Sequence, residues 1–153
     1  GLAGLRVGYG LGNEEVISFM NSVRQPFNVN SLAQMAAIFA LEDQDFVKMS
    51  RIHNRQIMLE LVNGLSSLGI KTLHSRGNFV LANFGNQIKH TKYSLGIKLF
   101  EVLLSLGVIT RPVTNYDLPN YLRISVGTEE ENKYFLKVLP QALDLIHSNS
   151  NYV

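Results

Sequence analysis

The sequence predicts an α/β fold made of two regions that a long helix connects. Up to about residue 45 the apolar residues recur mainly at helical spacing, and the same spacing continues without a break to Gly69. From Ile70 onwards, short strand-like runs alternate with amphipathic helices, a pattern typical of a compact α/β layer sandwich. We therefore expect a first region over 1–45, a connecting helix over 46–69 and a small α/β domain over 70–153.

Composition excludes several classes of protein. The chain has 153 residues, of which 46% are hydrophobic, which is enough for one good core. The net charge is +2 and the basic residues are scattered, so nothing indicates a nucleic acid or an acidic membrane as partner. The chain has no cysteine, which excludes disulfides, thiolate nucleophiles and cysteine metal sites. Its four histidines are far apart in sequence, and we expect no metal site.

The first region begins with a glycine-rich segment and continues with helices. Alternating apolar residues predict a strand over 5–11, and Asn13 is placed to cap a helix that follows. Ser31 and Gln34 have the spacing of a capping box for a helix over 32–41. That helix is apolar on nearly every side, so we expect it to be buried in the core or in a subunit interface.

The residue pattern of the second region predicts four strands and two helices, with glycines and capping residues at their boundaries. Thr128 and Glu131 form a second capping box, and Pro140 inside the last helix predicts a kink or a break. The expected elements are strands at 70–75 and 78–84, a helix at 94–106, strands at 108–111 and 121–126, and a final helix after Thr128.

Three arginines occupy positions suited to anion binding. Arg6 lies among glycines, where the backbone can approach a ligand closely, whereas Arg111 ends one predicted strand and Arg123 lies within the next. Two guanidinium groups on adjacent strands can converge on one doubly charged group. The alternative is that Arg111 and Arg123 point to solvent or pair with Asp117 and Glu129. These residues alone leave both interpretations open.

Three segments of the chain together resemble a known family. They are Gly1-Leu-Ala-Gly-Leu-Arg-Val-Gly-Tyr9, Val23-Arg-Gln-Pro-Phe-Asn28 and Tyr121-Leu-Arg-Ile-Ser-Val-Gly-Thr128. The combination resembles the C-terminal half of histidinol-phosphate aminotransferases, which belong to the fold-type I pyridoxal-phosphate enzymes, and the resemblance extends to about Leu143. It implies that 1–45 is the end of the large cofactor-binding domain and 70–153 the small C-terminal domain.

The resemblance also implies roles for the three arginines. In this family the arginine of the glycine-rich segment binds the phosphate of pyridoxal 5'-phosphate, and this role falls on Arg6. The arginine of the Leu-Arg-Ile-Ser-Val-Gly-Thr motif binds the acidic group of the substrate, which falls on Arg123. A second arginine about a dozen residues upstream assists in that recognition, which falls on Arg111. The expected substrates are histidinol phosphate with glutamate or 2-oxoglutarate, and the expected assembly is a cytoplasmic homodimer.

The chain departs from the family pattern in one important respect. The catalytic lysine that forms the Schiff base is expected just upstream of Gly1, and no lysine of this chain lies in a matching motif. We therefore expect that this chain is a fragment that contains no catalytic residue and is inactive by itself. Aromatic aminotransferases and threonine-phosphate decarboxylase share these motifs with variation. An alternative of another class is a non-catalytic α/β module that binds a phosphorylated metabolite or a peptide.

Overall fold

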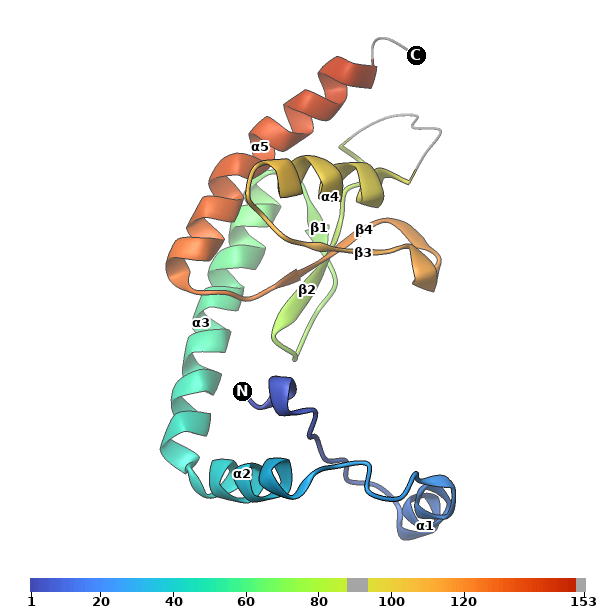
Figure 1. Ribbon diagram of the computed structural model, residues 1–153. Helices are drawn as coiled ribbons and strands as arrows, with labels where there is room; N and C mark the ends of the chain where they lie inside the picture. The colour runs from blue at the N-terminus through green and yellow to red at the C-terminus, as the bar shows by residue number, and fades with distance from the viewer. Residues whose placement is uncertain (88–93, 151–153) are drawn as a thin grey trace. The chain divides into compact units, whose positions relative to one another are not determined.

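The structure, a computed structural model, describes residues 1–87 and 94–150 and divides into two compact units. The first unit is Gly1–Arg51 and the second is Ile52–Val153, so the division falls inside helix α3 (Gln44–Ser67). Figure 1 labels the elements along the chain. Among the described residues, no helix is both long and apolar enough to cross a membrane.

The first unit is helical, and asparagine and aspartate side chains begin its helices. It contains the short 3-10 helix η1 (Ala3–Leu5), then α1 (Glu14–Val23), α2 (Ser31–Glu42) and the start of α3. Asn13 accepts a hydrogen bond from the backbone N–H of Glu15 at 2.9 Å, which confirms the predicted cap of α1. The cap of α2 is Asn30, which accepts from Ala33 N–H at 2.8 Å, so the capping box predicted at Ser31 is wrong by one residue.

Two further expectations for the first unit concern the strand over 5–11, which is wrong, and helix α2. The segment predicted as a strand over 5–11 instead follows η1 as irregular chain, because no strand of the described residues lies beside it to share hydrogen bonds. Helix α2 was expected in the core or in a subunit interface. It is not in a core of this unit, because Ala33 is its one buried residue while Leu32 and Phe39 are exposed. The subunit interface stays a prediction. An apolar helix becomes buried only where another surface covers it, and within the first unit most of α2 is left uncovered.

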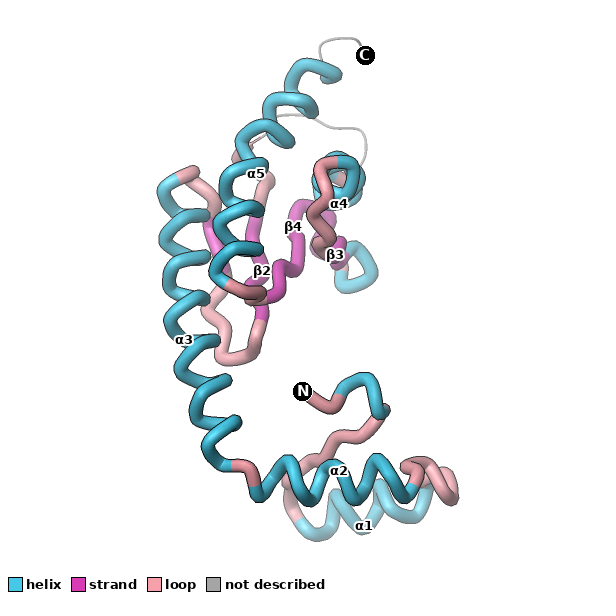
Figure 2. Tube along the Cα trace, turned by 60° about the vertical axis from the view of Figure 1, so that its left-hand side comes forward, coloured by secondary structure: helices cyan, strands magenta, loops and turns pink. Residues whose placement is uncertain are grey.

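The second unit is built on a four-stranded antiparallel sheet with the strand order β1-β2-β4-β3. Its strands are β1 (Lys71–Thr72), β2 (Phe79–Asn83), β3 (Arg111–Val113) and β4 (Leu118–Ser125). Besides the end of α3, its helices are α4 (Leu95–Ser105) and α5 (Glu129–Ser150). Figure 2 shows α3 and α5 side by side, and Gly64 of α3 lies against the Leu136 side chain of α5.

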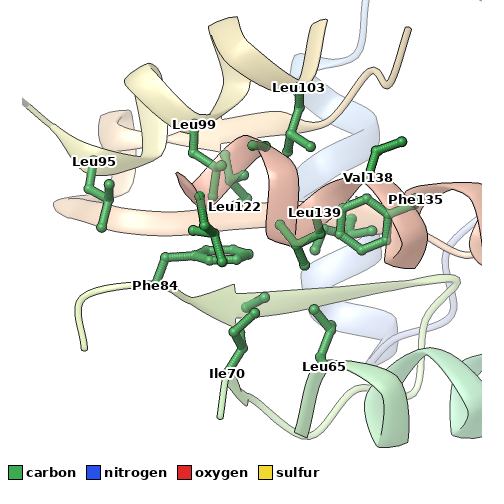
Figure 3. Packing of buried hydrophobic residues seen from close by; sticks show 14 of the residues in the cluster. Leu65, Ile70, Phe84, Leu95, Leu99, Leu103, Leu122, Phe135, Val138 and Leu139 are labelled. Carbon is green, nitrogen blue, oxygen red and sulfur yellow. The ribbon is translucent and has the colours of Figure 1, made fainter. Parts of the chain in front are cut away.

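One hydrophobic core joins the three helices of this unit to one face of the sheet. Leu61 and Leu65 of α3, Leu99 of α4, and Leu139 of α5 are fully buried in it. The sheet contributes Val80, Ala82, Leu122 and Ile124, which alternate along β2 and β4. Figure 3 shows Phe84, Leu122, Leu99 and Leu139 converging in this core. The layered α/β arrangement predicted from the sequence is therefore present in the second unit.

Prolines account for the main differences from the elements predicted here. The strand expected at 108–111 is instead β3 at Arg111–Val113, so Pro112 lies within a strand, at the edge of the sheet, where a residue without an N–H is tolerated. Pro140 was expected to kink or break the last helix, yet α5 continues through it from Glu129 to Ser150 without a break. The second capping box is confirmed: Thr128 N–H donates to Glu131 Oε2 at 2.7 Å, and Glu131 N–H donates to Thr128 Oγ1 at 3.2 Å.

Candidate functional site

The face of the sheet opposite the core carries polar and charged side chains. Because side chains alternate along a strand, the buried residues of β2 and β4 leave the intervening positions on the other face. These positions are Phe79, Leu81 and Asn83 of β2, and Tyr121, Arg123 and Ser125 of β4. We call this surface the open face. It is the part of the second unit where a ligand can approach the sheet directly.

Two of the arginines singled out in the sequence meet on this open face. Arg111 of β3 lies directly opposite Arg123 of β4 in the antiparallel register, so both side chains project from the same face. Directly opposed residues have Cβ atoms about 4.5–5.5 Å apart, and two like charges at this separation destabilise a sheet. An anion bound between them removes that repulsion. The arrangement thus suits a group with two negative oxygens.

Acidic side chains do not neutralise this pair within the described part of the chain. The alternative partners were Asp117 and Glu129, and neither forms an ion pair with an arginine there. Asp117 ends the 3-10 helix η2 (Thr114–Tyr116), whereas Glu129 pairs with Lys133. The hydrogen bond and the charge of Lys133 lower the pKa of the Glu129 carboxyl. The acid that could have paired with the arginines is therefore held elsewhere.

The guanidinium of Arg123 is held by its surroundings rather than by a salt bridge. Its Cζ atom lies 5.2 Å from the centre of the Phe79 ring, within the range of a cation–π contact. Arg123 is half-buried, and its Nε is buried without a hydrogen-bond partner among the described residues. A buried donor of a charged group without an acceptor is unfavourable. An anionic ligand would supply the missing acceptor.

A pair of polar side chains lies beside the arginine on the same face. Asn83 Nδ2 donates to the Tyr121 hydroxyl oxygen at 3.1 Å, across the β2–β4 pair. Asn83 Oδ1 accepts from the backbone N–H of Gly85 at 2.9 Å, which fixes the orientation of the amide. Because the Tyr121 oxygen accepts this bond, its own O–H remains able to donate to a ligand.

The third arginine, Arg6, belongs to the first unit. It is exposed and has left-handed backbone angles, with φ 57° and ψ 41°, directly after η1. Its Nη1 donates to the Ala3 carbonyl at 3.2 Å, which leaves most of its N–H groups available. A Cβ built on Gly4 or Gly8 would meet nothing within 4 Å, so packing inside the chain does not require these glycines. Open backbone beside an exposed guanidinium leaves room for an anionic group to approach.

Comparison with known sequences identifies the family. The profile of the family described as aminotransferase class I and II matches residues 1–139. The chain belongs to this family. Among curated relatives, this class I and II aminotransferase chain is 48% identical over 143 residues to a histidinol-phosphate aminotransferase of Methylobacillus flagellatus, covering 94% of the chain and 36% of the relative. It is 44% identical over 144 residues to histidinol-phosphate aminotransferase 2 of Nitrosospira multiformis, covering 94% and 35%.

Solved structures agree with the family assignment. The histidinol-phosphate aminotransferase of Sinorhizobium meliloti, crystallised with pyridoxal-5'-phosphate, superposes with a TM-score of 0.77 at 25% identity, over 95% of this chain and 38% of that one. A mutant aspartate aminotransferase of Thermus thermophilus gives a TM-score of 0.63 at 32% identity, over 93% and 38%. These matches confirm the predicted α/β fold of the fold-type I aminotransferases. The chain spans a little more than one third of the length of the curated relatives it matches.

Sequence reasoning identified the arginines but missed their neighbours. Phe79, Asn83 and Tyr121 contact Arg123 or adjoin it on the open face, and none of them was expected there. The strand pattern of 78–84 could have indicated Phe79 and Asn83, because they alternate with the buried residues. Which strand pairs with which, and in what register, was needed before Phe79 could be placed beside Arg123.

Proposed function

We propose that the intact protein carrying this chain is a pyridoxal-phosphate-dependent aminotransferase that transfers an amino group between histidinol phosphate and 2-oxoglutarate, in L-histidine biosynthesis. The observation that carries the proposal is the direct opposition of Arg111 and Arg123 on the open face, with no acidic partner among the described residues. The family and the relatives named above support this chemistry.

The chain would contribute binding and orientation. Arg111 and Arg123 would hold the acidic group of the substrate, the phosphate of histidinol phosphate or a carboxylate of glutamate, by paired hydrogen bonds from each guanidinium. The Tyr121 hydroxyl would add one donor, and the Phe79 ring would limit how far the Arg123 guanidinium can rotate. Holding the anionic end of the substrate at the sheet also limits where its amino group can lie.

Arg6 would hold the phosphate of the cofactor. Pyridoxal phosphate, when bound, withdraws electrons from the substrate carbon that carries the amino group. The chain's own part is to hold that phosphate through Arg6 and the open backbone around Gly4 and Gly8. We further propose that the catalytic lysine lies in a part of the protein outside these residues, since no lysine here occupies the matching motif.

A homodimer in the cytoplasm belongs to the same proposal. Helices α1 and α2 present many exposed apolar side chains, among them Phe19, Met20, Leu32 and Phe39. Phe27 is 99% exposed and has a positive φ of 56°, a backbone conformation that is uncommon for a bulky residue. Exposed apolar surface of this extent marks an interaction surface. It would pack against the remainder of the large domain and a second subunit.

The test is an assay of the intact protein with pyridoxal phosphate, measuring glutamate formed from histidinol phosphate and 2-oxoglutarate. Turnover that depends on both substrates is the expected result. A protein that binds the cofactor but prefers an aromatic amino acid, or decarboxylates threonine phosphate, would contradict the substrate assignment. Absence of both cofactor binding and turnover would favour the non-catalytic binding module, which the family assignment does not favour.

A further inference from the structure

Helix α3 is hydrogen-bonded to the two chain segments that flank β2 and β4. The side chains involved are His53 and Asn54, near the start of the second unit. Asn54 Nδ2 donates to the carbonyl of Gly77, in the turn before β2, at 3.1 Å. His53 Nε2 lies 3.1 Å from the carbonyl of Gly127, in the connection after β4. A carbonyl oxygen only accepts, so His53 Nε2 carries a proton and donates it. Two neighbouring residues of one helix therefore bind both segments.

The same two segments are also bonded to each other. The N–H of Val126 donates to the carbonyl of Asn78 at 2.8 Å, one step beyond the last register pair of β2 and β4, which is Phe79 with Ser125. The bonds from α3 join the next residue of each segment. This end of the strand pair is therefore fixed both across the pair and to the helix.

The contact between Arg123 and Phe79 lies at this end of the strand pair. A Cβ built on Gly77 would lie 3.4 Å from Phe79 Cε1, so the ring lies next to the glycine whose carbonyl Asn54 binds. The centre of the same ring lies 5.2 Å from Arg123 Cζ. A chain of contacts thus leads from Asn54 through Gly77 and Phe79 to the guanidinium of the open face.

Stability alone does not account for the asparagine at position 54. Asn54 Oδ1 is buried and has no hydrogen-bond partner among the described residues. Leaving this acceptor unpaired opposes the stability gained from the bond of Nδ2. The opposite amide orientation would place two oxygens against each other, because Gly77 presents a carbonyl. The net contribution of this side chain to folding is therefore small, and its distinct effect is to hold the turn before β2.

We propose that Asn54 and His53 are positioning residues for the guanidinium of Arg123. They act through the segments that flank β2 and β4, and not through contact with a ligand. Because these segments are held, the Phe79 ring stays against Arg123 and the guanidinium keeps the orientation in which it receives an anion. The inference rests on the proposed function in one respect, the anion-binding role of Arg123.

The probe is inorganic phosphate, titrated into the intact protein. NMR follows the Nε–H signal of Arg123, which is identified by its disappearance in Arg123→Gln. Because this Nε is buried, its proton is protected from exchange with water. A saturable shift is expected in the wild type, and it gives the phosphate affinity at this guanidinium without requiring turnover. No saturable shift in the wild type would overturn both the anion-binding role of Arg123 and the inference.

Matched variants remove each bond from α3. Asn54→Leu keeps the approximate shape of the side chain without its donor, and it should weaken phosphate binding at Arg123 by about two- to tenfold, up to the value of one neutral hydrogen bond. Asn63→Leu, the same substitution at an exposed position of α3, should leave binding unchanged. His53→Leu should also weaken binding. His53→Gln retains an N–H donor and should bind phosphate nearly as the wild type does.

Melting temperatures separate positioning from a general structural role. Asn54→Leu removes a buried unpaired oxygen together with the bond to Gly77, so its melting temperature should change little. Unaltered phosphate affinity in Asn54→Leu, or equal weakening in Asn63→Leu, would overturn the proposal. Weaker binding that comes with a large fall in the melting temperature would indicate general loosening of the fold and would overturn it too.

The transamination assay distinguishes a failure of this inference from a failure of the proposed function. Asn54→Leu should raise the KM for histidinol phosphate and leave cofactor binding unaltered. If the wild type shows no turnover but Asn54→Leu still weakens phosphate binding, the substrate assignment fails and the inference stands. If the wild type shows turnover and Asn54→Leu matches it in KM and in phosphate affinity, the inference alone fails.

Discussion

The two units of this chain have similar apolar content but differ in how much of it they bury. In the second unit, large side chains such as Phe84, Leu122 and Leu139 are fully buried in one core. In the first unit, whose residues are all described, Ala33 is the single buried hydrophobic residue, and Phe39 is 63% exposed. The same helical pattern thus produces a closed core in one unit and an open apolar surface in the other, because burial depends on which surfaces meet.

The largest expected effect comes from removing a buried phenylalanine of the second unit, and an exposed phenylalanine of the first unit provides the comparison. Phe84→Ala removes a fully buried ring and should lower the free energy of unfolding by about 3–5 kcal/mol. Phe39→Ala in the first unit should change it by less than about 0.5 kcal/mol, because its ring is already in water. Urea denaturation of the 153-residue chain measures both.

Equal losses in these two variants would contradict the comparison. A second measurement uses the intact protein, where the proposed large domain and second subunit would cover α2. There Phe39→Ala should become clearly destabilising, and an unchanged small effect would mean that α2 stays exposed.

A smaller effect is expected from two glycines that allow close packing inside the second unit. A Cβ on Gly96 of α4 would lie 2.7 Å from the Tyr121 carbonyl oxygen and 2.9 Å from that of Pro119, both backbone atoms of β4. Gly96→Ala should therefore force α4 away from the sheet and lower the free energy of unfolding by about 1–3 kcal/mol. A Cβ on Gly64 meets the Leu136 side chain, at both Cδ atoms and Cγ, and no backbone atom; a side chain can move more easily than the backbone.

Gly64→Ala is thus the matched control for the Gly96 prediction. Alanine also favours the helix at that position by about 1 kcal/mol, which offsets the contact with Leu136. Thermal denaturation should place Gly64→Ala closer to the wild type than Gly96→Ala. The opposite order would mean that the α3–α5 contact is the more rigid of the two.

The opposed arginines predict a small gain in stability when one is removed. Arg111→Gln eliminates like charges at directly opposite positions and should raise the free energy of unfolding by about 0.2–1 kcal/mol at low salt. Added sulfate should reduce the difference, because the anion stabilises the wild-type pair. Denaturation with and without sulfate measures the effect, and a loss of stability in Arg111→Gln at low salt would argue against repulsion across the strands.

The smallest expected effect is the pH dependence of the capping box at the start of α5. The Thr128 backbone N–H and hydroxyl lower the pKa of Glu131 below its ordinary value of 4.5. The pKa of Glu131 is thus lower in the folded protein than in the unfolded chain. The ionised carboxylate therefore stabilises the fold fully when the pH is above the unfolded pKa. This stabilisation is lost as the pH falls through the folded pKa. In Glu131→Gln, the stability of the fold should therefore decrease less as the pH is lowered.

Glu130→Gln is the control for this pH prediction. It removes a charge from the same helix turn without removing a capping bond. Melting temperatures from neutral pH down to about pH 3 give the comparison. An equal effect in Glu130→Gln would assign the pH dependence to net charge rather than to the Thr128–Glu131 bond.

Much of the fold could be predicted because it depends on local sequence. Asn13 and the Thr128–Glu131 box mark helix starts through bonds within a few residues, and Gly69 and Gly107 end helices with positive φ. The exposure of α2 in this chain could not be predicted, because burial depends on a surface that the helix's own sequence does not contain. The strand expected over 5–11 failed for the same reason, since a strand needs a neighbour.

The candidate site was predictable in its residues but not in its arrangement. Arg111 and Arg123 could be singled out, yet their direct opposition follows from a β3–β4 register that shifts between Pro112 and Val113. The contact of Phe79 with Arg123 depends on the β2–β4 pairing over more than forty intervening residues of chain.

The central claim is that the two units supply different halves of one reaction, cofactor binding from Arg6 and substrate binding from Arg123. The most direct measurement is the cofactor dissociation constant and the KM for histidinol phosphate in Arg6→Gln and Arg123→Gln of the intact protein. Arg6→Gln should weaken cofactor binding by roughly 10- to 100-fold, the loss of a charge-assisted bond, with little change in KM at saturating cofactor. Arg123→Gln should raise KM by a similar factor and leave cofactor binding unaltered. Loss of cofactor binding in Arg123→Gln, or a raised KM alone in Arg6→Gln, would contradict the account.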